Sequence, residues 1–167
     1  MKSSRSTAPL GTLFATLLLC AAALAGNYFE LSISFSVSFI FGSVAALLAL
    51  QFLGLLPGLT VAVVAGIYTW FHWGHPYALL VMCLEILCVS LTLRRVNNLV
   101  LADAAFWLMV GGPLVTLLYW GALDLSFDSA VMIALKQSAN GVMNASIATF
   151  IVVGLALGPV GRFFPRL

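Results

Sequence analysis

Four polar side chains able to form ion pairs or hydrogen bonds lie within apolar stretches of the sequence. Glu85 comes nine residues after Pro76, and Lys136, Asn140 and Asn144 recur every fourth residue. A spacing of four residues places the last three on one stripe of a helix. A charged group at the centre of a membrane costs about 2.5 to 3.5 kcal/mol on insertion scales, so each charge is expected to have a partner.

Two compatible interpretations of these residues remain open. In the first, Glu85 and Lys136 form a structural ion pair, and the asparagines connect neighbouring helices. In the second, the stripe lines a cavity that opens outward and binds a small polar or anionic molecule. At 1.5 Å per residue, Glu85 is predicted to lie about 13 Å below the outer boundary, close to the depth of Asn140.

Two histidines, His72 and His75, occupy a turn between apolar stretches. The H-x-x-H spacing suits two metal or haem ligands, but the sequence shows no further ligand at a suitable distance. The alternatives are a histidine that contacts the ligand or responds to pH at the pocket mouth, or a polar residue at the membrane interface. No nucleophile, phosphate loop or metal-ligand cluster is present, so no enzymatic activity, cofactor or metal is predicted.

The composition indicates that lipid surrounds most of the chain. Of 167 residues, 63% are hydrophobic and 7% are charged, and the mean hydropathy is +1.15. Ordinary soluble domains carry about 25% charged residues. The chain is therefore predicted to be an integral membrane protein, and nucleic-acid binding is excluded as its function. The cysteines Cys20, Cys83 and Cys88 all lie in apolar runs, where they are expected to act as small hydrophobic residues.

Six apolar stretches are long enough to cross a membrane as helices, because unpaired backbone groups are too costly in lipid. They are predicted at residues 10–26, 33–52, 55–73, 76–93, 102–123 and 131–155. Pro113 is expected to kink the fifth helix. The predicted fold class is all-α, with one six-helix transmembrane domain at residues 10–157 between cytoplasmic tails at 1–9 and 158–167.

The basic residues predict the orientation in the membrane. The side that holds both termini carries Lys2, Arg5, Arg94, Arg95, Arg162 and Arg166, whereas the opposite loops carry only the acidic Glu30, Asp124 and Asp128. The positive-inside rule therefore places both termini in the cytoplasm of a bacterial inner membrane. Asp103 is expected to pair with Arg94 and Arg95 at the cytoplasmic edge.

An alternative concerns the first stretch. Ala23-Leu24-Ala25 follows a basic segment and an apolar core, as in a signal-peptide cleavage site, and cleavage there would leave five spans. The neighbouring alanines also suit close packing between helices, which favours an uncleaved first helix.

The order of several motifs resembles a known family of six-helix membrane modules. The motifs are Phe29-Glu30-Leu31-Ser32-Ile33-Ser34, Leu53-Gly54-Leu55-Leu56-Pro57-Gly58, the run from Tyr68 to Tyr77, Glu85, Phe106-Trp107 with Gly112-Pro113, Lys136-Gln137, Asn140-Gly141 and Asn144-Ala145. They resemble the N-terminal sensor modules of bacterial histidine kinases and diguanylate cyclases. Those modules are similar to the substrate-binding subunits of energy-coupling-factor transporters for vitamin uptake. The resemblance covers roughly residues 29–152.

The resemblance implies a fold like that of such a subunit, a small-molecule site facing outward, and a role in signalling. No kinase or cyclase region follows Arg162, so it implies either the module alone or a separate output polypeptide. One alternative is a transporter subunit that docks onto coupling subunits, for which the spacing of Ala21 and Ala25 is suitable. Another is a structural or assembly protein without a ligand. The expected ligand-binding residues are Glu30, His72, His75, Glu85, Trp107, Lys136, Asn140 and Asn144.

Overall fold

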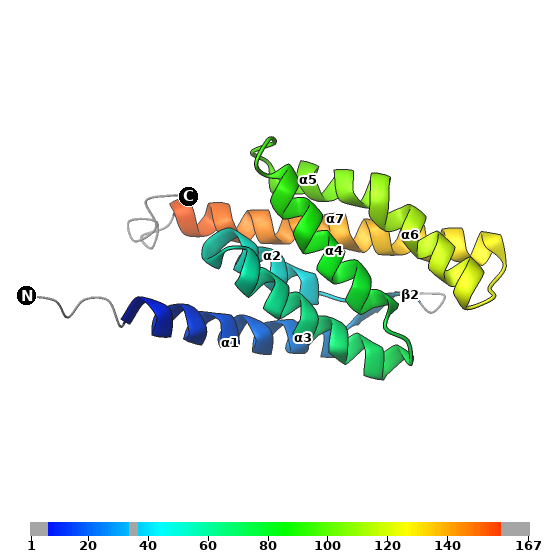
Figure 1. Ribbon diagram of the computed structural model, residues 1–167, viewed down its shortest axis with the longest axis horizontal. Helices are drawn as coiled ribbons and strands as arrows, with labels where there is room; N and C mark the ends of the chain where they lie inside the picture. Colours follow the sequence, from blue (N-terminus) through cyan, green and yellow to red (C-terminus); the bar gives the residue numbers. More distant parts are fainter. Residues whose placement is uncertain (1–6, 34–36, 158–167) are drawn as a thin grey trace, which may run out of the picture.

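The computed structural model describes residues 7–33 and 37–157 as an elongated bundle of helices with a small hairpin at one end (Figure 1). The elements are α1 (Thr7–Tyr28), β1 (Leu31–Ile33), β2 (Val37–Phe39), α2 (Gly42–Leu53), α3 (Leu55–Trp73), α4 (Tyr77–Thr92), α5 (Leu99–Phe106), α6 (Gly112–Leu117) and α7 (Phe127–Leu157). The π-helical segment η1 (Trp107–Gly111) joins α5 to α6, and a second one, η2 (Leu118–Ala122), extends α6, so that the four segments form one continuous helical rod. The chain is thus an all-α, multi-pass membrane protein.

The lengths of the helices agree with most of the predicted spans. Within the described residues, four helical segments are long and apolar enough to cross a membrane: Leu10–Tyr28, Leu55–Trp73, Leu99–Ala122 and Phe127–Leu157. Helices α2 and α4 are apolar but shorter, with 12 and 16 residues. The predicted third span matches α3 at both ends, and the fourth differs from α4 by one residue at each end.

The second predicted span is wrong in its first half. Its start lies in an antiparallel hairpin, in which β1 pairs with β2 in the register Leu31 with Phe39 and Ile33 with Val37. Helix α2 begins only at Gly42. The predicted tails at 1–9 and 158–167 lie largely outside the described residues, although α1 already begins at Thr7.

Asn27, near the end of α1, joins three helices. Its side chain is 2% exposed, its Nδ2 donates to the carbonyl of Ala65 in α3 at 3.1 Å, and its Oδ1 accepts from the backbone N–H of Gly42 at 2.7 Å. A Cβ at Gly42 would overlap the Asn27 amide, so only glycine fits there. Ala23, one turn earlier, is fully buried in the core. The segment around the predicted cleavage site is therefore part of the bundle.

Small residues on α3 allow the neighbouring helices to approach closely. A Cβ at Gly66 would lie 2.6 Å from the Cα of Leu79 in α4, and one at Gly58 would lie 3.1 Å from the Cβ of Leu50 in α2. Ala62 and Ala65 on the same helix are fully buried. Because lipid gives helices little hydrophobic reason to associate, such close van der Waals packing holds the bundle together.

The predicted kink at Pro113 takes the form of a π-helical turn. Proline has no backbone N–H and its ring crowds the carbonyl four residues earlier. The preceding turn widens, so that the N–H of Gly112 donates to the carbonyl of Trp107, five residues back. Such insertions often occur at functional sites, and this one positions the Trp107 side chain in the bundle interior.

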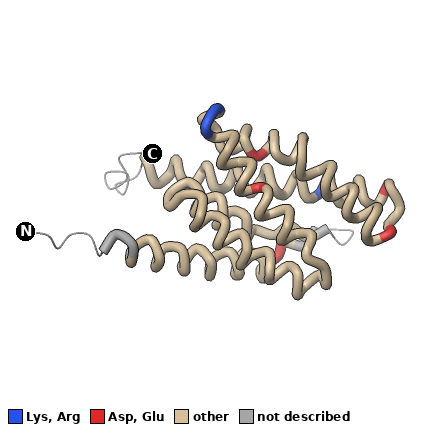
Figure 2. The backbone as a smooth tube through the Cα atoms, in the orientation of Figure 1, with Lys and Arg blue, Asp and Glu red and all other residues tan. Residues whose placement is uncertain are grey.

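The two ends of the bundle differ in the charged residues that they carry (Figure 2). Helix α1 begins and α7 ends at the same end as the α4–α5 loop, which contains the exposed Arg94 and Arg95. The hairpin and the α3–α4 and α6–α7 loops lie at the other end, where Asp124 and Asp128 are exposed. We call these the basic end and the acidic end.

Candidate functional site

A small pocket of about 50 Å³ lies between the hairpin, α4, η1 and α7, toward the acidic end of the bundle. Its wall is mostly apolar and aromatic and its only charged group is Lys136. The lining residues are Ser38, Ile40, Trp73, Ala78, Val81, Met82, Trp107, Lys136, Gln137, Asn140 and Gly141. Of the predicted ligand-binding residues, Trp107, Lys136 and Asn140 therefore line one pocket. An apolar wall with a few polar groups is typical of small-molecule sites.

Trp107 forms the inner wall of this pocket because Gly141 gives it space. A Cβ at Gly141 would overlap the indole nitrogen, so the ring lies directly on the α7 backbone. The indole Nε1–H donates to Oε1 of Glu85 at 3.4 Å, and Trp107 is 6% exposed. One side of Trp107 therefore faces the pocket and its N–H faces a buried carboxyl group.

The partner of Glu85 is Asp103, and the predicted ion pair between Glu85 and Lys136 is wrong. Glu85 is 1% exposed and interacts with the carboxyl group of Asp103 on α5 and with Trp107. Asp103 is fully buried, so its predicted pairing with Arg94 and Arg95 is also wrong. The position of Glu85 along its own helix could not show which helix packs against α4 there.

Lys136 is half-buried in the pocket wall, and the acid that acts on it electrostatically is Glu30. No carboxylate of the described residues forms an ion pair with it. Glu30 lies between α1 and β1, and its Oε2 is 3.9 Å from Nε2 of His72, although the His72 side chain is 48% exposed. Neither Glu30 nor His72 lines the pocket, and the ammonium group of Lys136 remains available to an anion.

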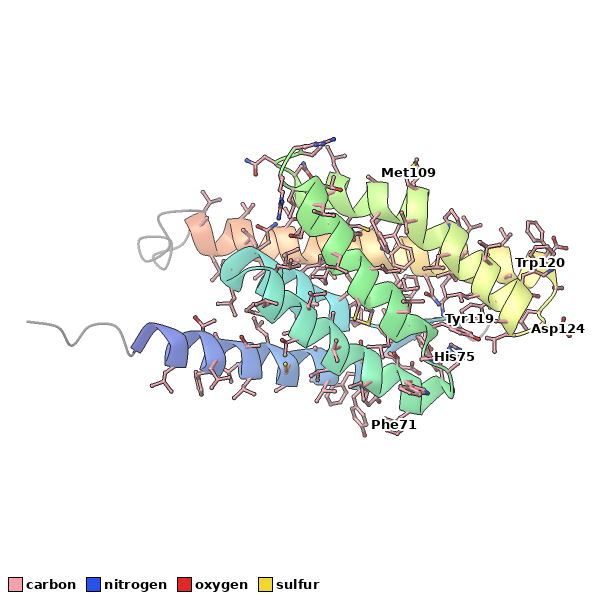
Figure 3. All side chains as sticks on the ribbon, viewed as in Figure 1. Phe71, His75, Met109, Tyr119, Trp120 and Asp124 are labelled. Carbon is pink, nitrogen blue, oxygen red and sulfur yellow. The ribbon has the colours of Figure 1, made fainter. Side chains whose placement is uncertain are left out.

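His75 connects to the pocket through two intermediate side chains. Its Nε2 lies 3.4 Å from the hydroxyl of Tyr119, and Nε2 of Gln137, a pocket residue, donates to that hydroxyl at 3.4 Å. Figure 3 shows His75 and Tyr119 close together at the acidic end. The Nδ1 atom of His75 is buried without a hydrogen-bond partner, and burial lowers the pKa of the imidazole below its usual value. His75 is therefore mainly neutral at pH 7.

The two asparagines of the stripe hold the segment before α2 against α7. Asn140 accepts from the N–H of Ile40 at 2.9 Å and donates to its carbonyl at 2.8 Å. Asn144 donates to the same carbonyl at 2.9 Å and to the hydroxyl of Ser43 at 2.8 Å. Asn144 is 1% exposed and does not line the pocket. Asn140 lines it, but its replacement would also break two structural hydrogen bonds.

The sequence analysis missed several residues of this region. Asp103 was predicted as part of a charge pair at the cytoplasmic edge, and nothing in the sequence indicated that Tyr119 and Gln137 connect His75 to the pocket. Tyr119 lies within the π-helical segment η2, whose position no periodicity in the sequence reveals. Among the described residues, no group of three or more His, Cys, Asp or Glu side chains is arranged to hold a metal ion.

Comparisons with known proteins agree with this arrangement at the level of the fold. No protein-family profile matches the sequence, and no curated protein matches it. The structure is similar to the solved structure of the S component of a bacterial ECF transporter, with a TM-score of 0.64 and 20% sequence identity. The match covers 95% of this chain and 99% of that chain. The likeness shows an S-component-like fold, and none of the comparisons supports the predicted sensor module of kinases and cyclases.

Proposed function

We propose that this chain is the substrate-binding subunit of a small-molecule uptake system in a bacterial inner membrane. The observation that carries the proposal is a pocket lined by Lys136, which forms no ion pair with any described residue, inside a fold similar to that of an ECF S component. This was the second of the functions considered from the sequence. The sensor function has no comparable support from the fold.

The lining favours a small ligand with an anionic group and an apolar, flat part. Lys136 supplies the charge, Gln137 and Asn140 supply amide groups, and Trp73 and Trp107 supply aromatic surfaces. A pocket of about 50 Å³ is smaller than the roughly 300 to 1,000 Å³ of typical ligand sites. A larger ligand therefore requires the flexible side chains in the wall, such as Met82 and Lys136, to move aside.

Helix α1 offers a surface for a coupling subunit. Ala23 and Asn27 face the core, whereas Ala21 and Ala25 are exposed. Two small residues four positions apart let another membrane helix approach closely. The exposed leucines of the same helix, which include Leu17 and Leu24, would add apolar contact on either side.

The proposed orientation places the basic end in the cytoplasm and the pocket toward the outside. Arg94 and Arg95 mark the basic end, and Asp124 and Asp128 mark the opposite end. By the positive-inside rule, a cytoplasmic reporter fused after Leu167 is expected to be active, and a periplasmic reporter is expected to be active in the Asp124 to Asp128 loop. An active periplasmic reporter at Leu167 would contradict the proposed orientation.

The test of the function is ligand capture. The protein is purified from membranes in detergent, and small molecules that copurify with it are identified by mass spectrometry. We expect a small anion to be retained, and Lys136→Met to weaken its binding about 10- to 100-fold, because a hydrogen bond to a charged group contributes about 1.5 to 3 kcal/mol. Binding is measured as ligand-induced thermal stabilisation.

The control is Arg95→Met, which removes an exposed cation at the basic end. It is expected to leave ligand binding unchanged. The proposal fails if no small molecule copurifies and a panel of small anions gives no stabilisation. It also fails if Lys136→Met binds the captured ligand as tightly as the wild type does.

A further inference from the structure

The carboxyl groups of Glu85 and Asp103 meet in the interior of the bundle, beneath the pocket. Glu85 lies on α4 and Asp103 on α5, and their side chains are 1% and 0% exposed. They are close enough for a hydrogen bond between the two carboxyl groups. Two carboxyl oxygens can form such a bond only if one of them carries a proton, because a carboxylate is an acceptor only.

The surroundings provide almost no other donor. Trp107 donates one N–H to Glu85 at 3.4 Å, and no N–H or O–H of the described residues reaches either oxygen of Asp103. A fully buried polar side chain without a donor is rare in folded proteins. As long as both acids are ionised, no described residue therefore donates a hydrogen bond to Asp103.

The pair of carboxyl groups also lacks a cationic neighbour: no Lys, Arg or His of the described residues forms an ion pair with Glu85 or Asp103. The titratable and charged side chains on the elements packed around the pair are Tyr68 and His72 on α3, Tyr77, Cys83 and Cys88 on α4, Tyr119 on η2, and Asp128 and Lys136 on α7, with none on α2, η1 or α6. None of these groups interacts with Glu85 or Asp103, whose carboxyl groups interact with each other. No basic side chain of the described residues neutralises the pair.

Two carboxyl groups in contact cannot both be ionised in a medium of low dielectric constant. A metal ion would need more oxygen or nitrogen ligands than this pair provides, and the described residues hold no suitable group of three. One proton is the smallest addition that supplies the missing donor and removes one charge. We propose that Glu85 and Asp103 form a proton-binding site, which holds a single shared proton at neutral pH and joins α4 to α5.

The shared proton also fixes the pocket wall. With one proton between them, Glu85 keeps its other lone pairs for the indole N–H of Trp107. Loss of the proton would place two negative charges in contact and push α4 away from α5, which continues directly into η1 and Trp107. The proton-binding site is independent of whether a ligand enters the pocket, so it can be tested without one.

The experiment is infrared spectroscopy of the purified protein at neutral pH, in H₂O and in D₂O. The chain has five acidic side chains, of which Asp124 and Asp128 are exposed and Glu85 and Asp103 are buried. We expect the wild type to show the C=O stretch of one protonated carboxylic acid, which shifts in D₂O. Glu85→Gln and Asp103→Asn are each expected to abolish this band, because the amide N–H replaces the shared proton and leaves one ordinary carboxylate.

The controls are Glu30→Gln and Asp124→Asn, which should keep the band, and Trp107→Phe, which should keep it at a shifted frequency. Absence of the band in the wild type would overturn the proposal, and this result does not depend on whether a variant folds. Persistence of the band in both Glu85→Gln and Asp103→Asn would also overturn it, because two independently protonated acids would then be present. A protein that binds no small molecule but shows this band would reject the proposed function and retain the proton-binding site.

Discussion

Replacement of Gly141 by leucine is expected to lower the free energy of unfolding by about 3 kcal/mol, the upper part of the usual range for overpacking. Any Cβ at this position would overlap the indole nitrogen of Trp107, whose N–H donates to Glu85. The ring cannot move away without losing that hydrogen bond and disturbing η1. The measurement is denaturant-induced unfolding in detergent micelles, followed by circular dichroism.

The matched control is Gly154→Leu on the same helix. A Cβ at Gly154 meets no atom within 4 Å, and glycine is a poorer helix former than leucine by somewhat less than about 1 kcal/mol. Gly154→Leu is therefore expected to leave stability unchanged or slightly raised. Equal effects of the two substitutions would show that the contact between Trp107 and Gly141 does not contribute to stability.

Helical spans were predictable where apolar length was the deciding signal. Helices α3 and α4 match their predicted ranges within one residue because Gly54 and Gly74, both with positive φ, and Pro76 end or begin them. These residues act locally, so their effect can be recognised in the sequence. The π-helical turns of η1 and η2 depend on packing around Pro113 and Tyr119, and length alone gives no information about them.

The hairpin was missed although its signal is present. From Leu31 to Phe39, serine alternates with an apolar residue at every position, which is the period of a strand. Averaged over a long window, the segment is as hydrophobic as a membrane span, and it was therefore predicted to be continuous with α2. The two-residue period should have taken precedence over the mean hydropathy.

The pairings within the candidate site could not be predicted from the sequence. The cost of burying ionisable groups in lipid drew attention to Glu85 and Lys136 but did not identify their neighbours. Helical spacing gives depth along one helix, whereas the partner depends on which helices are neighbours and how each is rotated. Because α5 packs against α4 at the depth of Glu85, the partner is Asp103, and the cation remains in the pocket.

Replacement of Asn27 by leucine is expected to destabilise the bundle by about 4 kcal/mol, the sum of about 2 kcal/mol for each buried backbone group deprived of its partner. The substitution keeps the side chain close in volume but removes the bonds to the carbonyl of Ala65 and the N–H of Gly42. Neither group is accessible to water, and lipid offers no substitute. Unfolding in detergent micelles measures the change.

The control for Asn27→Leu is Asn97→Leu, which replaces an exposed asparagine in the α4–α5 loop and is expected to change stability by less than about 0.5 kcal/mol. Gly42→Ala provides a second route to the same contact, because its Cβ would overlap the Asn27 amide. If Asn27 joins the three helices as described, the double variant should be less destabilised than the sum of the two single variants, since both break one shared interaction. Strict additivity would mean that Asn27 and Gly42 contribute to stability independently, and the proposed junction between α1, α2 and α3 would then be incorrect.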